Sequence, residues 1–368
     1  MDRLWHVIAI GLAFGMTVFV HEAGHFIAAR LSGMAVHEFS IGFGRPLLFW
    51  LRRGETQYSF RLWPFFSYVR IAGMEPGDEH PRGFGTKSRL AQAFVLVLGC
   101  IMNFLLAVAI FIFIGAVLGQ PVGVTNTVDR VLAGGPAEAA GMEVGDKILG
   151  FGERVGLEHK DIQEFIQQHP DQAIVLEIER AGRRMSVTVT PKEVTVRELQ
   201  PVGKATKNAE LQKSKLVYRK IGRIGIVFRA RVERIGVWRS VREGFGQTYD
   251  MVRLLIVYLY AVIAGKMPLL LEGPVGVAHT LYEEVQTGWI SFLGTSAALT
   301  VGIGFLNLMP IPPLDGSRLV IIGVEAIRRR PIDKRKENLV HLVGFGLLLA
   351  LVVVLTYNDI LRIIFGRE

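Results

Sequence analysis

Four long apolar stretches constrain the fold of this chain more than any other feature. They cover residues 5–29, 94–118, 290–308 and 339–357. At 1.5 Å per helical residue, each can cross the ~30 Å hydrocarbon core of a bilayer, or nearly so. The composition agrees, because 50% of the residues are hydrophobic and only 20% are charged. The sequence therefore predicts a polytopic α-helical membrane protein with four transmembrane helices.

The first apolar stretch could be read as a secretory signal peptide, because Arg3 precedes it. No small-x-small cleavage site ends the stretch, however, and His21, Glu22 and His25 lie near its far end. We therefore expect it to be retained as the first membrane span.

The basic residues predict the orientation of the spans. Nine Lys and Arg lie in residues 30–93 and seven in residues 318–338, whereas the two ends of the chain carry few. By the positive-inside rule both loops face the cytoplasm, and the large segment between the second and third spans lies outside. Topology then accounts for most of the net charge of +9, so nucleic acid is not needed to explain it.

The connections between spans differ in character. Residues 38–72 are rich in aromatic residues and glycine and predict membrane-associated β-hairpins on the cytoplasmic side. Residues 124–228 read as strand, short helix, strand, helix, hairpin and last strand at 224–228, with an exposed insertion at 201–220. Residues 232–264 predict an amphipathic, interfacial helix. The expected regions are 1–118, 119–230, 231–289 and 290–368.

The sharpest chemical signal is His21-Glu22-Ala23-Gly24-His25. Two histidines four residues apart share one helix face and can bind one Zn²⁺, and the glutamate beside the first can accept a proton from metal-bound water. Two core histidines on a soluble helix would be the alternative. That reading fails inside a membrane span, where ionisable groups are costly and functional by default.

A catalytic zinc needs a third protein ligand. Glu38 and Glu55 are possible but lie in the predicted hairpins. Asp315 is the better candidate, because Pro310, Pro312 and Pro313 break the third span near the same membrane side as the histidines. The alternative is that the prolines merely end one helix and Asp315 caps the next.

Cys100 is the single cysteine of the sequence, which excludes an intrachain disulfide and a Cys-rich zinc module.

Taken in order, these motifs resemble the site-2 protease family, in its bacterial RseP/RasP-like branch. The match covers nearly the whole chain and includes the histidine motif, Phe39 to Gly44, Gly273-Pro274-Val275-Gly276, Asn307 to Gly316 and Asn358-Asp359. The segment with Gly135-Pro136-Ala137 resembles one extracytoplasmic PDZ-like α+β domain. Phe66-Ser67 and Ser317 depart from the family pattern, which usually has glycine there.

The resemblance implies a zinc-dependent intramembrane endopeptidase with His21, His25 and Asp315 as ligands, Glu22 as base and Asn307 as a helper. It implies a multi-pass protein of the bacterial inner membrane that cuts single-span membrane proteins after a separate site-1 protease. A pseudoprotease scaffold would not need buried ionisable groups. A metal transporter should carry more polar residues along its second and fourth spans than Asn103 and His341.

Two segments are candidates for substrate contact. The hairpins, with Tyr68 and Val69, offer a strand edge to an unwound substrate, or they pack as a plug. The loop with Gly222, Ile224, Gly225 and Ile226 offers backbone N–H groups to a terminal carboxylate, or it is a plain closing strand.

Overall fold

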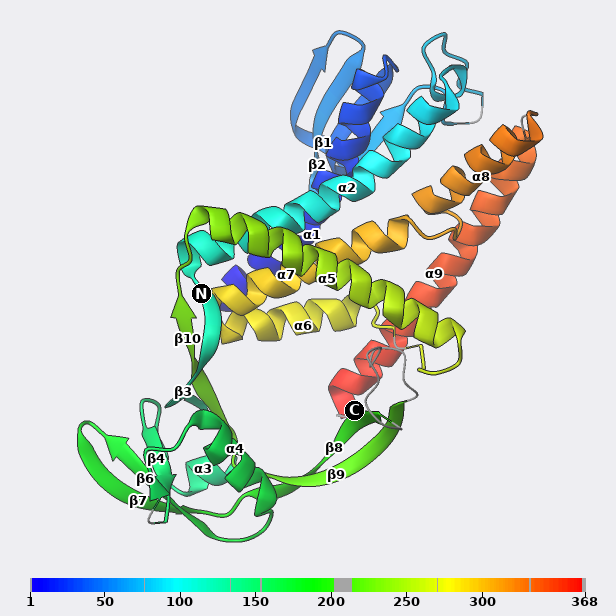
Figure 1. Cartoon of the computed structure of the whole chain (residues 1–368). Coiled ribbons are helices and arrows are strands. Elements are labelled where there is room, and N and C mark those ends of the chain that lie inside the picture. Colours follow the sequence, from blue (N-terminus) through cyan, green and yellow to red (C-terminus); the bar gives the residue numbers. More distant parts are fainter. Residues whose placement is uncertain are drawn as a thin grey trace. The chain divides into compact units, whose positions relative to one another are not determined.

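The computed structural model describes residues 2–75, 77–132, 134–152, 154–201, 214–269, 271–330 and 332–365. The chain divides into two compact units (Figure 1). The membrane unit comprises Met1–Leu118, Gly236–Val262 and Met267–Glu368, and the strand-rich unit comprises Gly119–Ile235 with Ile263–Lys266. Each unit is described by itself below.

Within the described residues, four helices of the membrane unit are long and apolar enough to cross a membrane, in agreement with the four predicted spans. They are α1 (Asp2–Leu31), α2 (Arg89–Phe113), α7 (Trp289–Asn307) and α9 (Lys334–Phe365). A π-helical turn, Ile114–Leu118, extends α2. Three further helices are α5 (Val237–Ile263), α6 (Pro274–Thr287) and α8 (Asp315–Arg328). The fourth span is longer than its predicted apolar core, since α9 carries charged residues at both ends.

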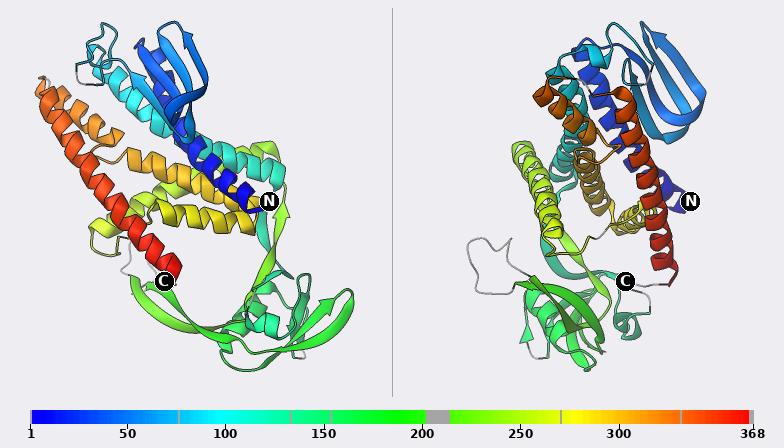
Figure 2. Two further views of the ribbon diagram at one scale, coloured as in Figure 1. Left: turned by 180° about the vertical axis from the view of Figure 1, so that it is seen from behind. Right: turned by 90° about the vertical axis from the view of Figure 1, so that its right-hand side faces the viewer.

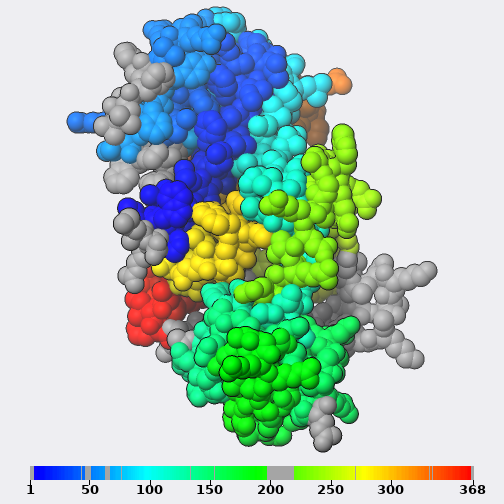
Figure 3. All heavy atoms as spheres, turned by 90° about the vertical axis from the view of Figure 1, so that its left-hand side faces the viewer, coloured from blue at the N-terminus to red at the C-terminus, as the bar shows by residue number. Residues whose placement is uncertain are grey.

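Glycines allow the spans to approach closely. A Cβ on Gly24 of α1 would lie 2.6 Å from the Leu98 carbonyl oxygen of α2, and one on Gly304 of α7 would lie 3.0 Å from Asn103 Cβ. Small residues at such crossings are how membrane helices gain packing contacts. Figure 2 shows α1, α2 and α7 from two further sides, and Figure 3 shows α1, α2 and α6 forming one continuous face of this unit.

A two-stranded sheet joins α1 to α2. Strands β1 (Val36–Arg53) and β2 (Thr56–Ile71) are antiparallel, with several register shifts. The first part of β1 pairs with both ends of β2, so that Phe39 lies opposite Tyr58 on one side and Val69 on the other. Val36 and Ile71 are buried with Ala28 and Ala29, which anchors the sheet at the end of α1. The predicted hairpins are present, and residues 67–71 form one edge.

The strand-rich unit has a sheet in the order β10-β3-β4-β6-β7, with β5 paired to β4. Its strands are β3 (Gln120–Val131), β4 (Lys147–Phe151), β5 (Arg154–Val155), β6 (Ile174–Arg180), β7 (Arg183–Val189) and β10 (Ile226–Glu233). Helices α3 (Pro136–Ala139) and α4 (His159–Gln168) complete it. Ile148, Ile162, Leu176 and Ile178 are fully buried in its core. The predicted order of short helix, strand, helix and hairpin is found.

Two predictions for this part of the chain were wrong. Both flanks of the predicted insertion form a hairpin of β8 (Lys192–Pro201) and β9 (Ser214–Arg223), whereas residues 202–213 lie outside the described residues. Ile224 and Gly225 precede the last strand rather than belonging to it. A polar segment can form a strand when side chains on the paired strand stabilise it, as in the ion pair between Lys220 of β9 and Glu193 of β8. The polar composition of residues 201–220 therefore did not reveal these strands.

Candidate metal centre

Helix α1 presents His21 and His25 on one face. Their Nε2 atoms lie 3.1 Å apart, and the two residues are only 6% and 7% exposed. The Nδ1 atom of His25 donates a hydrogen bond of 2.8 Å to the Val95 carbonyl oxygen of α2. This bond fixes the tautomer of His25 and leaves the lone pair of Nε2 free to bind a cation.

Asp315 is the first residue of α8, after the proline-rich break that follows α7. Its Oδ2 atom lies 3.1 Å from His21 Nε2 and 3.1 Å from His25 Nε2. Gly316 makes this position accessible, because a Cβ there would lie 2.2 Å from the Leu308 carbonyl oxygen. The chain between α7 and α8 thus returns to the end of α7 at Gly316. This turn directs the Asp315 carboxylate at the two imidazoles.

Three candidate ligand atoms, His21 Nε2, His25 Nε2 and Asp315 Oδ2, are spaced as a zinc ion requires. They form a triangle with three sides of 3.1 Å. Tetrahedral zinc with bonds of 2.0–2.1 Å to nitrogen and oxygen separates its ligand atoms by about 3.3 Å. Two imidazoles and one carboxylate are also a donor set that suits zinc and leaves one position open.

Helix α2 is shaped around His25. A Cβ on Gly99 would lie 2.5 Å from His25 Cε1 and 2.7 Å from its Nε2. Any larger residue at position 99 must therefore displace either the imidazole or the helix. Together, Gly99 and the Val95 carbonyl group fix the position of the His25 imidazole.

Glu22 extends into the same site from α1. Its Oε2 atom accepts a hydrogen bond of 3.0 Å from the Val69 backbone N–H on the edge of the two-stranded sheet. The carboxylate lines a cavity of about 430 Å³ together with both histidines, Asn307 and Asp315. A carboxylate beside the ligand triangle is in place to exchange protons with a water in that cavity.

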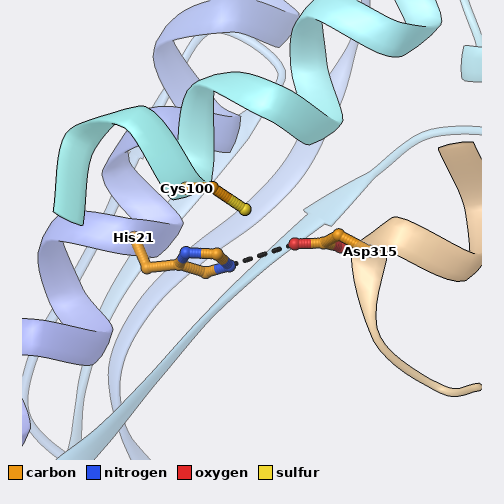
Figure 4. Close-up of side chains that lie close together, drawn as sticks. All are labelled: His21, Cys100 and Asp315. Atoms are coloured by element: carbon orange, nitrogen blue, oxygen red, sulfur yellow. Dashed lines mark hydrogen bonds and ion pairs between the residues drawn. The ribbon is translucent and has the colours of Figure 1, made fainter. Parts of the chain in front are cut away.

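Asn307 ends α7 and brings its Nδ2 atom within 3.4 Å of His21 Nε2. Arg318, one turn after Asp315 on α8, also lines the cavity. Cys100 of α2 lies above His21, and its sulfur is within 4.8 Å of the ligand atoms of His21 and Asp315 (Figure 4). The site therefore combines groups from α1, α2, α7, α8 and the sheet edge.

The other sequence candidates lie elsewhere. Glu38 pairs with Arg61, and Glu55 pairs with Arg82, so neither faces the histidines. Tyr68 lies with its ring 5.2 Å from the Arg61 guanidinium and belongs to this polar cluster of the sheet. Burial opposes ionisation of Glu38, but hydrogen bonds from Arg61, Tyr68 and Ser59 outweigh it and lower its pKa.

In the strand-rich unit, Gly222, Ile224, Gly225 and Ile226 line a cavity of about 320 Å³ beside α4. Ile224 accepts a hydrogen bond from the Ala137 N–H, and Gly225 accepts one from the Leu132 N–H. Within the described residues, the N–H groups of Ile224 and Gly225 donate to no backbone carbonyl.

Sequence reasoning did not single out Gly99, the Val95 carbonyl or Arg318. A glycine within the most apolar span signals a close helix approach, and Gly99 could have been found in this way. The other two give no local signal, because their roles depend on how the helices pack.

Comparison with known proteins places the chain in a family. The sequence profile of peptidase family M50 matches residues 9–351. The zinc metalloprotease RasP of Oceanobacillus iheyensis is 30% identical, with 97% of this chain and 99% of that protein covered. The RasP protein of Geobacillus kaustophilus is 29% identical over 98% of this chain and 99% of its own. The metalloprotease MmpA of Caulobacter vibrioides is 30% identical over 97% and 95%.

These matches extend over almost the whole chain. The family match includes all or part of each of the four spans, and it includes the positions of His21, His25 and Asp315. Two of the three relatives are named as zinc metalloproteases and the third as a metalloprotease. The chain belongs to peptidase family M50 and is a multi-pass membrane zinc metalloendopeptidase of the site-2 type.

Proposed function

We propose that this enzyme cuts the transmembrane segments of single-span membrane proteins, with His21, His25 and Asp315 as its zinc ligands. The observation that carries this proposal is the triangle of 3.1 Å sides. Its two histidines lie on a helix that can span a membrane, and its aspartate begins the helix that follows another such helix. A pseudoprotease would have no use for such a set of buried groups.

The chain's own residues divide the work of peptide hydrolysis. When bound, zinc acts as a Lewis acid on the scissile carbonyl and lowers the pKa of water. Glu22 accepts the proton of the attacking water and transfers it to the leaving amide nitrogen. The Asn307 amide donates a hydrogen bond to the carbonyl oxygen, since its Nδ2 atom lies at the edge of the ligand triangle.

The edge of the sheet provides a way to hold the substrate extended. A helical substrate hides its carbonyls in i→i−4 hydrogen bonds, so it must unwind before it is cut. The strand around Val69 pairs with β1 on one side, and the Val69 N–H points to Glu22 on the other. An unwound substrate that adds to this edge would run past the catalytic carboxylate.

The positive-inside rule supports an orientation in the bacterial cytoplasmic membrane. The sheet and the Arg328-Arg329-Arg330 run then face the cytoplasm, and the strand-rich unit lies outside. Substrates include membrane-anchored regulators and remnants of signal peptides, trimmed first by a separate site-1 protease.

The strand-rich unit acts as one PDZ-like domain. Its cavity is lined by Ile224 and Gly225, whose N–H groups donate to no backbone carbonyl of the described residues, and by the apolar side chains of Ile166 and Phe228. This combination suits a C-terminal carboxylate and the apolar side chain that precedes it. A carboxylate of this kind is what a first cut outside the membrane produces.

The function is tested with Glu22→Gln in proteoliposomes that contain a pretrimmed single-span substrate. We expect cleavage to fall by about 10²–10⁴-fold with zinc content unchanged, because the amide cannot accept the proton. Substrate should remain bound to the variant and be recovered by crosslinking. Cleavage at the parental rate would contradict the role of Glu22, and cleavage only outside the bilayer would contradict the substrate class.

The orientation is tested with Ser186→Cys in the strand-rich unit, with the buried Cys100 as an unreactive background. We expect an impermeant thiol reagent to label position 186 from outside intact cells. Labelling from the cytoplasmic side alone would reverse the topology.

A further inference from the structure

The two histidines of the ligand triangle are held differently. The Nδ1 atom of His25 donates to the Val95 carbonyl oxygen. The Nδ1 atom of His21 is buried and has no hydrogen-bond partner among the described residues. Metal-binding histidines almost always donate their second ring N–H to an acceptor, which fixes the ring and its tautomer. His21 therefore needs an acceptor that the direct contacts do not provide.

Asn103 of α2 has the complementary deficit. Its residue is 0% exposed, and neither its Oδ1 nor its Nδ2 atom has a partner within the described part of the chain. Two other buried polar side chains in these spans are satisfied by their own helix. Thr17 donates to the Ala13 carbonyl oxygen, and Ser296 donates to the Phe292 carbonyl oxygen. An unpaired amide buried between membrane helices is costly, so Asn103 also needs a partner.

The two side chains lie in the same part of the helix packing. Asn103 follows Cys100 by three residues on α2, and the Cys100 sulfur is within 4.8 Å of a ring nitrogen of His21. Asn103 also packs on Gly304, three residues before Asn307 on α7, whose amide is 3.4 Å from His21. Two residues therefore border His21. Cys100 lies one helical turn from Asn103 on α2, and Asn307 lies one helical turn from Gly304, which Asn103 contacts.

We propose that Asn103 is a positioning residue for the metal centre, which accepts the His21 Nδ1–H through one buried water. Such a water has three polar partners: His21 Nδ1 and the two polar atoms of the Asn103 amide. That number is typical of a conserved buried water. The amide oxygen thereby holds His21 in the tautomer that keeps Nε2 available for zinc, as the Val95 carbonyl does for His25.

This inference rests on the proposed ligand role of His21. The alternative is that Asn103 only fills space between α2 and α7. A role in packing alone predicts that an apolar residue with the same branched shape replaces Asn103 without effect on the metal.

The test measures zinc affinity of the full-length protein in detergent by competition with a chelator. We expect Asn103→Leu, which keeps the number and branching of the side-chain heavy atoms but removes the acceptor, to weaken zinc binding by about 10–100-fold. Asn103→Asp restores an acceptor and should bind zinc within about threefold of the parent. The matched control is Thr17→Val on α1, which removes a buried hydroxyl satisfied within its own helix and should leave the affinity unchanged.

A double-mutant cycle connects the effect to His21. In a His21→Ala background, Asn103→Leu should change the residual affinity by less than about twofold, because the ring that it orients is gone. The proposal is overturned if Asn103→Leu binds zinc like the parent, or if it weakens binding equally in both backgrounds. If His21→Ala itself retains full zinc affinity, the ligand assignment fails instead.

The Co²⁺-substituted protein gives a second readout that packing alone would not move. We expect its visible absorption bands to shift in Asn103→Leu and not in Thr17→Val, since His21 loses its fixed orientation. Unchanged bands in Asn103→Leu would also overturn the proposal.

Discussion

The two units of the molecule surround a carboxylate in opposite ways: the Asp146 side chain is 0% exposed, and the Asp315 side chain is 20% exposed. Asp146 of the strand-rich unit accepts hydrogen bonds from Arg180 Nε at 2.7 Å, from Arg180 Nη2 at 2.8 Å and from the Glu143 N–H at 2.8 Å. For Asp315 of the membrane unit, the ion-pair partners among the described residues are His21 and His25. Each Nε2 atom lies 3.1 Å from Asp315 Oδ2.

This difference distinguishes a carboxylate that stabilises its own domain from one that is placed to bind a metal. The charge of Asp146 is neutralised by a guanidinium of its own domain, so it needs nothing from outside the protein. The neighbours of Asp315 are imidazoles, which can bind the same cation together with it but, when neutral, do not balance its charge. A carboxylate whose partners are all potential ligands indicates a metal site, whereas one with an arginine indicates a structural link.

The largest expected effect tests the structural half of this comparison. Asp146→Asn leaves Arg180 without its buried partner and should lower the unfolding free energy of the strand-rich unit by about 3 kcal/mol. Hydrogen exchange of the core amides in β4 and β6 measures the loss, and zinc content should not change.

Asp129→Asn is the matched control, because the Asp129–Arg229 pair is exposed and should be worth less than about 1 kcal/mol. Equal effects of the two substitutions would show that burial of Asp146 does not matter. Loss of zinc in Asp146→Asn would show that the two units are not independent.

The sequence predicts the site residues that form a local pattern and misses those whose role depends on how the helices pack. His21, Glu22 and His25 were predictable because their spacing matches one helix face, and Asp315 because three prolines interrupt an apolar span. Gly99 and Asn103 lie in a span that is apolar all round, so periodicity could not show which of its faces meets α1. Likewise, β8 and β9 depend on pairing with each other, which local propensity does not reveal.

A smaller effect should come from the shape of α2 around the ligand. Gly99→Ala adds a methyl group within 2.5 Å of the His25 ring, and we expect it to weaken zinc binding by about tenfold. Chelator competition measures this loss.

Gly302→Ala on α7 is the control for this change, because a Cβ there meets no atom within 4 Å. We expect it to bind zinc like the parent. If Gly99→Ala also binds zinc normally, His25 is not held by α2 as the structure has it.

The smallest expected effect is the pH dependence of the strand-rich unit. Burial opposes ionisation of Asp146, but hydrogen bonds from Arg180 and the Glu143 N–H outweigh it, so its pKa lies below the usual range. The stabilisation is therefore complete above the unfolded pKa of about 4 and is lost as the pH falls through the lower folded value.

We expect the difference in unfolding free energy between the parent and Asp146→Asn to be constant from about pH 7 to pH 5 and to shrink below about pH 4. Hydrogen exchange corrected for intrinsic rates measures it. A difference that shrinks as the pH rises would contradict the sign of this shift.

The most direct test of the metal centre is the zinc content of Asp315→Ala after dialysis against a chelator. We expect the parent and Glu55→Gln, whose exposed carboxylate pairs with Arg82, to retain zinc, and Asp315→Ala to lose it. Full zinc in Asp315→Ala would contradict the account, because Asp315 would then be a partly buried carboxylate that the metal does not need.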